Sequence, residues 1–196
     1  MNKRMVAVLA LTFSGAVWAQ TGEFWFSAGE SLLSNPGLGA DVVGTSKDIQ
    51  LTDGFRFGFR GGFNQGRRFG HEIQYAYNRT QLQYNDQGGA QQGMAYHQVG
   101  YNFLLYAMPE ESRVRVFGTG GVHFDRFNPP GTTLSSGGGE TKFGLNYGGG
   151  VKVHLAKFYG LRFDVRRYET PKPFSLPLAQ GWLHQVEISA GVGVGF

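Results

Sequence analysis

Apolar and polar residues alternate along most of this chain. The final segment, HQVEISAGVGVGF, places small or polar residues on one parity, and on the other it places the apolar residues Val186, Ile188, Ala190, Val192 and Val194. Successive side chains of a β-strand point to opposite faces of the sheet, so a period of two predicts a strand with one apolar face. The pattern alone leaves open whether that face meets lipid or a protein interior.

Seven further segments repeat the alternation. It is clearest in GFRFGFRGGF, KFGLNYGGGVKVHL and YGLRFDVRRY, and weaker around residues 72–77, 98–105 and 114–125. It is least regular in EFWFSAGESL, because Trp25 falls on the polar parity when Phe24 and Phe26 form the apolar one. Together the segments predict eight strands of about 10 to 14 residues each.

The links between these segments alternate in length. Long links rich in turn residues fall near residues 35–49, 81–95, 127–141 and 170–181, and short ones fall near 64–68, 108–112 and 156–158. This alternation predicts an up-and-down arrangement in which all the long loops emerge at one end. Both termini then lie at the other end.

Two closed eight-stranded barrels fit this arrangement. In a lipocalin-like barrel the apolar parity lines a ligand cavity, whereas in a membrane barrel it faces lipid and the polar parity fills the interior. The glycine-rich polar parity and strand lengths near the roughly 9–11 residues of a tilted membrane strand favour the membrane barrel. So do aromatic residues near the predicted strand ends, namely Phe63, Phe69, Phe158, Tyr159, Phe196, Tyr77 and Trp182. A periplasmic ligand-binding barrel remains an alternative.

Composition and the first residues indicate an exported protein. MNKRMVAVLALTFSGAVWAQ combines a charged start, a short apolar run and small residues before Gln20, which is typical of a secretory signal. We therefore expect residues 1–19 to be a cleaved signal peptide and residues 20–196 to form one barrel domain. The chain has no cysteine, which excludes disulfides and thiolate metal sites. A net charge of +4, spread along the chain, does not indicate a nucleic-acid partner.

Two segments carry a family resemblance. The ending AGVGVGF resembles the C-terminal signature of bacterial outer-membrane barrels, and GGGVKVHLAKFYGLRFDVRRY is similar to the sixth and seventh strands of the OMP β-barrel family. The whole of residues 20–196 resembles the small group that includes the OmpA membrane domain, OmpX and the opacity proteins.

The resemblance implies an all-β fold, a closed eight-stranded antiparallel up-and-down transmembrane β-barrel in the outer membrane of a Gram-negative-type cell, with periplasmic termini. It also implies that the barrel assembly machinery reads the last strand through Ile188, Val192, Val194 and Phe196. The expected partners are outer-membrane lipids and lipopolysaccharide, and the expected state is a monomer without cofactors.

The polar parity would bring many charges into the barrel interior. These are the bases Arg56, Arg60, Arg115, Lys142, Lys152, Arg162 and Arg166 and the acids Glu72, Asp125, Asp164 and Glu187. Because an unpaired buried charge costs several kcal/mol, we expect pairs between neighbouring strands. The expected pairs are Arg60 with Glu72, Arg166 with Glu187, and Asp164 with Lys152 or Arg162, and the remaining bases would stay hydrated near the mouths.

Three functions fit such an interior. A plug of ion pairs would serve a structural or surface-interaction protein, and an incompletely filled lumen would make a narrow pore. A lipid A-modifying enzyme would need a histidine beside a serine and an acid, but no such trio can be assembled from local spacing around His71, His97, His123, His154 and His184. A catalytic residue is therefore not expected. Binding would then fall to the long loops, where Phe174, Leu176 and Leu178 are candidate exposed apolar residues.

Overall fold

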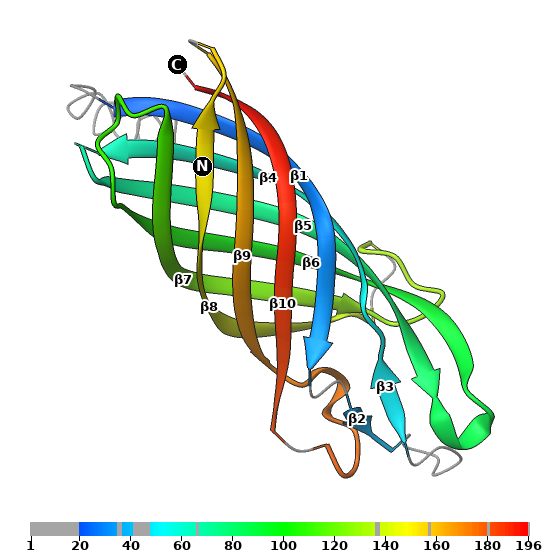
Figure 1. The fold of residues 1–196 in the computed structure, drawn as a ribbon. Helices are drawn as coiled ribbons and strands as arrows, with labels where there is room; N and C mark the ends of the chain where they lie inside the picture. Colours follow the sequence, from blue (N-terminus) through cyan, green and yellow to red (C-terminus); the bar gives the residue numbers. More distant parts are fainter. Residues whose placement is uncertain are drawn as a thin grey trace, which may run out of the picture.

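The computed structural model describes residues 20–34, 37–40, 48–65, 67–135, 138–156, 158–179 and 181–195. Eight long strands form one closed antiparallel barrel (Figure 1). They are β1 (Gln20–Ser34), β4 (Gly54–Gln65), β5 (Phe69–Tyr84), β6 (Ala90–Tyr106), β7 (Val114–Asn128), β8 (Glu140–His154), β9 (Tyr159–Pro171) and β10 (Trp182–Gly195). The expected signal peptide, residues 1–19, and Phe196 lie outside the described residues.

Each long strand pairs with its neighbour in the chain, and the ends of the sheet meet. β1 pairs with β10 from Glu23 opposite Gly195 to Ser34 opposite His184, which closes the barrel. Closure leaves no long strand with an unpaired edge, as lipid requires. The predicted closed, eight-stranded, antiparallel fold is confirmed.

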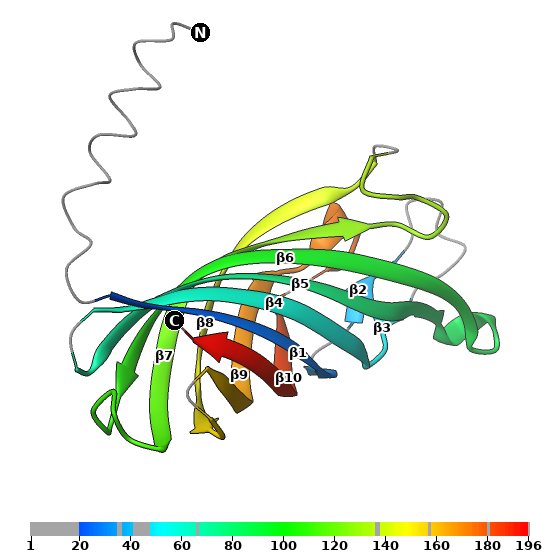
Figure 2. The ribbon, with the colours of Figure 1, turned by 90° about the horizontal axis from the view of Figure 1, so that it is seen from above.

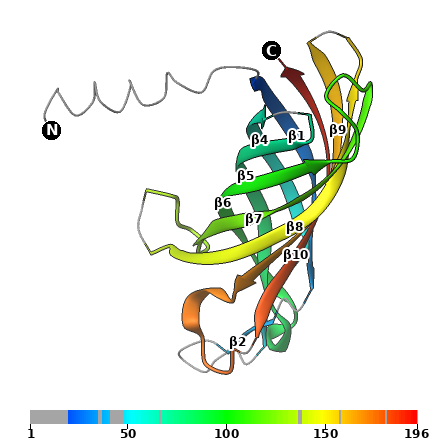
Figure 3. The same ribbon diagram turned by 90° about the vertical axis from the view of Figure 1, so that its left-hand side faces the viewer.

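The two ends of the barrel differ in their connections. The short turns lie at the same end as the C-terminal end of β10, and the long connections lie at the other end (Figures 1 and 3). We call these the short-turn end and the loop end. The loop end carries β2 (Gly37–Gly39), β3 (Ile49–Leu51) and two single turns of 3-10 helix, η1 (Asn85–Gln87) and η2 (Pro173–Ser175).

One predicted loop is largely strand. The region near residues 81–95 was expected to be a long polar link, yet β5 and β6 stay paired out to Tyr84 opposite Ala90. This hairpin reaches past the other strands at the loop end (Figures 1 and 2). β3 pairs with its outer part, with Ile49 opposite Tyr84. Consequently β5 and β6 are longer than the expected 10 to 14 residues, at 16 and 17 residues.

In this barrel wall the distribution of polar and apolar side chains between inside and outside is the reverse of that in a water-soluble protein. Among the described residues, most buried side chains are polar or charged, and large apolar side chains such as Ile73 and Val165 are exposed on the outer face. Trp25, which broke the pattern of the first strand, is buried inside at 2% exposure, whereas Phe24 and Phe26 are exposed outside. The polar parity therefore fills the interior.

Apolar side chains also gather inside, but only near the ends of the lumen. At the loop end a cluster is formed by Leu38, Ile49, Leu51, Leu82, Met94, Tyr96, Phe127 and Leu183. We call it the loop-end cluster. Phe174 and Leu176, expected to be exposed, pack against it and are partly buried. Leu178 is exposed as expected, at 76%.

Candidate functional site in the barrel interior

Two arginines of β9 and one acid of β5 meet across the barrel. Arg162, Asp164 and Arg166 alternate along β9, so all three side chains point inward. Arg162 donates to Asp164 through Nε at 2.7 Å and to Glu72 through Nη1 at 2.6 Å. Arg166 Nη2 lies 2.8 Å from Glu72 Oε1 and 2.9 Å from Asp164 Oδ1. Both carboxylates are therefore shared by both arginines.

A third carboxylate, Glu187 of β10, joins the same group. Arg60 donates to Glu187, and Arg56 Nη2 lies 3.2 Å from it. Tyr168 and Ser189 donate their hydroxyls to Glu187 at 2.7 and 2.5 Å. Arg60 links Glu187 to the other two carboxylates, because its guanidinium lies 3.7 Å from Asp164 Oδ2 and 3.8 Å from Glu72 Oε1.

These seven residues form one buried unit, which we call the central network. Its members are Arg56, Arg60, Glu72, Arg162, Asp164, Arg166 and Glu187, and none is more than 3% exposed. They come from β4, β5, β9 and β10, so the contacts run across the lumen as well as between neighbours. Charge-assisted bonds of this kind, several per carboxylate, fix the side chains in position.

The loop side of the interior holds a buried hydroxyl, imidazole and carboxylate. His123 Nε2 lies 2.8 Å from Thr170 Oγ1, and Thr170 donates to Asp125 Oδ2 at 2.9 Å. In a catalytic triad the acid holds the imidazole from its other nitrogen. Here His123 Nδ1 has no hydrogen-bond partner, and all three residues are at most 2% exposed. The geometry is that of a packed polar contact, not of an activated nucleophile.

At the short-turn end the interior is organised by Glu23, which the sequence analysis missed. Lys152 donates to Glu23, while Trp25 Nε1 and Asn64 Nδ2 donate to it at 3.0 and 2.8 Å. Lys152 also donates to the Tyr106 hydroxyl at 2.6 Å. Glu23 shares its parity with Trp25, so the irregular parity of that strand was the signal that could have found it.

Arg115 completes this end of the interior without a hydrogen bond. Its guanidinium stacks over the Tyr106 ring, 3.6 Å from the centroid, and lies 3.8 Å from Glu23 Oε1. All three guanidinium nitrogens are buried and unpartnered. The expectation that the remaining bases stay hydrated near the mouths is wrong for Arg56 and Arg115, which are at most 2% exposed.

The expected ion pairs are found in part. Arg60 lies beside Glu72, and Asp164 contacts Arg162 rather than Lys152. The expected contact between Arg166 and Glu187 is not formed, although these residues are opposite each other in the β9–β10 register. Arg166 reaches Glu72 across the lumen instead. The inward base Lys142 is only partly buried near the loop end, where it contacts Glu140 at 2.6 Å.

The last strand exposes the residues expected to act as an assembly signal. Ile188 and Val192 are exposed on the outer face, and Val194 is partly exposed. Phe196, the fourth of these residues, lies outside the described part of the chain.

The remaining histidines are paired without forming a metal site. On the outer face His71 Nδ1 lies 2.5 Å from the Tyr101 hydroxyl, and His97 Nδ1 lies 2.7 Å from that of Tyr75. His184 contacts Glu169. Within the described ranges no group of three or more histidine or acidic side chains is placed to hold a metal ion, and no helix is long and apolar enough to cross a membrane.

Comparison with known proteins places the fold in a family. The model of the outer membrane protein beta-barrel domain matches residues 5–196. The chain belongs to this family. A search of curated proteins gave no match. The family implies the bacterial outer membrane, where the apolar outer face of the barrel contacts lipid.

Solved structures show the same fold at low sequence identity. Neisserial surface protein A is 15% identical, with 91% of this chain and 100% of that chain covered and a TM-score of 0.57. OprG from Pseudomonas aeruginosa is 15% identical, covering 89% and 96%, with a TM-score of 0.59. The outer membrane protein AlkL, solved in lipid bilayers, is 14% identical, covering 93% and 94%, with a TM-score of 0.54. These likenesses concern the fold alone.

Proposed function

We propose that this protein is a structural or surface-interaction barrel of the outer membrane whose lumen is plugged. The observation that supports this most directly is the central network, in which arginines and carboxylates from four strands meet across the lumen with at most 3% exposure. Eight strands enclose a space just wide enough for packed side chains. A continuous water path through the middle would require several of these contacts to break together.

Energetics support a plug that stays closed. Breaking a buried ion pair by withdrawing one partner costs about 3–5 kcal/mol, because a buried charge is left uncompensated. Arg60 and Arg166 each contact more than one carboxylate, so opening a path would separate several pairs at once. The loop-end cluster adds an apolar layer at the loop end of the lumen.

Planar-bilayer recording of the purified, refolded barrel tests the plug. We expect no steady single-channel conductance from protein whose folded state is verified by its different gel migration before and after boiling. Boiled protein added at the same concentration is the control for detergent artefacts. Large, reproducible channels from the folded fraction alone would contradict the plug and favour the narrow pore.

The topology and biogenesis belong to the same proposal. Residues 1–19 serve as a cleaved signal peptide, the termini and short turns face the periplasm, and the long loops face the outside, where lipopolysaccharide surrounds a monomeric barrel. The barrel assembly machinery reads the last strand through Ile188, Val192, Val194 and Phe196. Support comes from the exposed Ile188 and Val192 on the outer face of β10.

Deleting Phe196 tests the assembly role. We expect a lower fraction of heat-modifiable barrel in the outer membrane with unchanged export. Replacing the exposed loop residue Leu178 with serine is the matched control, because it changes an apolar side chain far from β10's last residues. An unchanged assembled fraction after the deletion would contradict the signal.

The loop end offers the surface for a partner. Leu134 and Leu178 are exposed there at 51% and 76%, on connections that the barrel holds in place. Variable binding functions commonly reside on such loops. Cell-surface labelling of a cysteine introduced at Leu178 tests this orientation, and labelling only after the outer membrane is opened would reverse it.

A further inference from the structure

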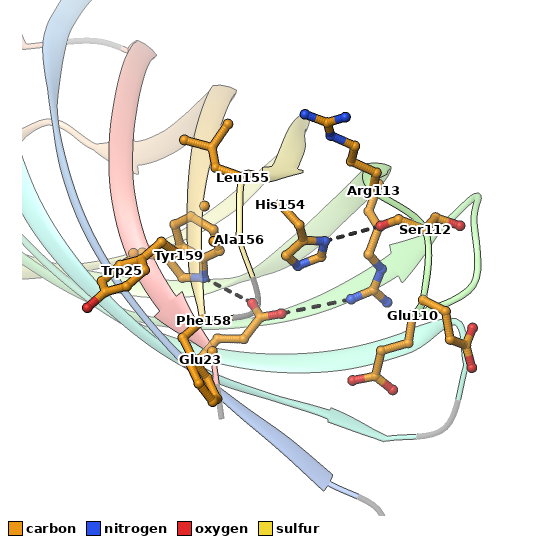
Figure 4. Close-up of a pocket in the computed structure, with 15 residues that line it drawn as sticks. Glu23, Trp25, Glu110, Ser112, Arg113, His154, Leu155, Ala156, Phe158 and Tyr159 are labelled. Carbon is orange, nitrogen blue, oxygen red and sulfur yellow. Dashed lines mark hydrogen bonds and ion pairs between the residues drawn. The ribbon is translucent and has the colours of Figure 1, made fainter.

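A pocket of about 570 Å³ opens at the short-turn end of the barrel. Figure 4 shows side chains that line it, with Glu23 and Trp25 from β1, His154 from β8 and Tyr159 from β9. Glu110 lines it from the β6–β7 turn. None of the seven residues of the central network lines this pocket.

The inner wall of this pocket contains a cation that is only weakly compensated. Arg115 lies directly opposite Lys152 in the β7–β8 register, so two bases share the single carboxylate of Glu23. Lys152 takes the close contact, and Arg115 is left 3.8 Å away with no hydrogen bond from any of its three nitrogens. A buried guanidinium favours an oxyanion that can accept two parallel bonds.

The same pocket contains a carboxylate with one unpartnered oxygen. One carboxylate oxygen of Glu110 is buried and makes no hydrogen bond, and no ion pair joins Glu110 to another described residue. An unpartnered buried carboxylate oxygen favours a donor, best of all a charged one. The pocket therefore presents complementary sites for both ends of a zwitterion.

An apolar groove on the outer wall adjoins this pocket. It has a volume of about 370 Å³, and the two spaces share Leu155, Tyr159, Gly160 and Gly193 in their linings. The rest of the groove is apolar and faces outward, with Phe24, Phe26, Leu161, Val192 and Val194 along it. The pocket is on the lumen side of the wall and the groove on its outer side, so a ligand with its polar head in the pocket reaches the groove over the rim at the β8–β9 turn, where Leu155 and Tyr159 line both spaces.

We propose that the pocket and groove together bind one phospholipid with a zwitterionic amine headgroup, such as phosphatidylethanolamine. The phosphate contacts Arg115, the ammonium contacts Glu110, and one acyl chain lies along the groove beside Phe24 and Val192. Charge complementarity and the residues shared by the two linings support this occupant. The inference rests on the proposed orientation, which places the short-turn end in the periplasmic leaflet.

Titration of the delipidated barrel in detergent tests this site, with bound lipid counted by native mass spectrometry. Phosphatidylethanolamine should bind about tenfold more tightly than phosphatidylglycerol, which has the phosphate but lacks the ammonium, since one charged hydrogen bond is worth about a factor of ten. Arg115→Gln should weaken both lipids about tenfold or more. Glu110→Gln should remove only the preference for phosphatidylethanolamine.

Matched variants separate the site from general charge effects. Asp86→Asn removes an exposed carboxylate at the loop end, Arg68→Gln removes an exposed guanidinium at the short-turn end, and neither residue lines the pocket. Both should leave the affinities unchanged. Leu161→Trp narrows the groove and should weaken both lipids without changing the preference between them. If Arg115→Gln fails to refold, Glu110→Gln and Leu161→Trp still decide the result.

Three outcomes would overturn the proposal. The first is equal binding of both lipids by the wild-type barrel, and the second is unchanged affinity in Arg115→Gln or Leu161→Trp. The third is competition by free glycerophosphoethanolamine as strong as that by the lipid, which would assign the pocket to a soluble ligand. Because the titration uses no membrane and no current, its failure leaves the plugged lumen untouched, and channel formation would leave this site untouched.

Discussion

In the central network four arginines meet three carboxylates, whereas at the short-turn end Arg115 and Lys152 meet only Glu23. Each group has one more base than acid, yet the excess is handled differently. In the centre every carboxylate lies within 4 Å of at least two arginines, so the excess charge is shared. At the short-turn end Glu23 also lies within 4 Å of both bases, but Lys152 takes its close contact and Arg115 makes no hydrogen bond.

This difference distinguishes charges that stabilise the barrel from a charge that is available to bind a ligand. Shared charges with short contacts hold strands together, and in the central network only one buried guanidinium nitrogen, Arg60 Nε, lacks a hydrogen bond. A buried cation without hydrogen bonds next to a pocket costs stability in the free protein, and that cost can be recovered when an anion binds. The two regions should therefore respond in opposite ways to loss of charge.

The largest effect is expected in the central network. Glu72→Gln withdraws a carboxylate that lies 2.6 Å from Arg162 and 2.8 Å from Arg166. Leaving these buried guanidinium groups undercompensated should lower the free energy of unfolding by about 3–5 kcal/mol. Urea titration of the refolded barrel, followed by loss of the heat-modifiable band, measures the change.

A matched substitution on the outer face isolates the role of burial. Glu30 is an exposed carboxylate of β1, so Glu30→Gln removes the same charge from a position outside the lumen. We expect no measurable change in its unfolding midpoint. A loss in Glu72→Gln no larger than in Glu30→Gln would show that the network does not hold the barrel together.

A smaller loss of stability is expected when Lys152, the base in close contact with Glu23, is replaced. Lys152→Met removes the close donor to Glu23, but Arg115 stands 3.8 Å away and can move toward the freed carboxylate. We expect a loss of about 2–3 kcal/mol in the same urea titration, below that of Glu72→Gln. An effect as large as that in the centre would mean that Arg115 does not substitute for Lys152.

Sequence periodicity located these charges on the inner face but did not predict all their partners. A period of two shows which face a side chain occupies and not how strands are staggered around the barrel. Arg60 and Glu72 lie on adjacent strands near one short turn, so that pair could be expected. The contact between Arg166 and Glu72 joins strands on different sides of the lumen, and local spacing carries no information on it.

Two other differences between the predicted and the observed structure also have physical causes. The polar composition of the segment after residue 80 indicated a loop, yet Leu82 and Met94 point into the loop-end cluster, and their burial extends the β5–β6 pairing. Glu23 was missed because Trp25 appeared to be an error in the alternation. Instead the indole is an inward side chain that donates to Glu23.

The next effect concerns the packing of this indole. A Cβ at Gly193 would lie 2.4 Å from the Trp25 ring and 2.5 Å from the Phe24 carbonyl oxygen, so Gly193→Ala should displace both the indole and the β1 backbone and cost about 1–3 kcal/mol in the urea titration. The control is Gly61→Ala, because a Cβ at Gly61 meets no atom within 4 Å. Equal stability of the two variants would show that Trp25 and β1 have room to adjust. The short-turn end of the lumen would then be less tightly packed than its contacts indicate.

The smallest effect should come from the residue with the least compensated charge. Arg115→Met keeps an apolar side chain over Tyr106 but removes a guanidinium that makes no hydrogen bond. Replacing a poorly compensated buried charge with a well-packed apolar group is often neutral or stabilising, so the unfolding free energy should change by less than about 1 kcal/mol or rise. The same urea titration without added lipid measures it. A loss matching that of Lys152→Met would mean that Arg115 supports the barrel as the central arginines do. The contrast between shared and unshared charge would then fail, and with it the reason for an anion at the short-turn end.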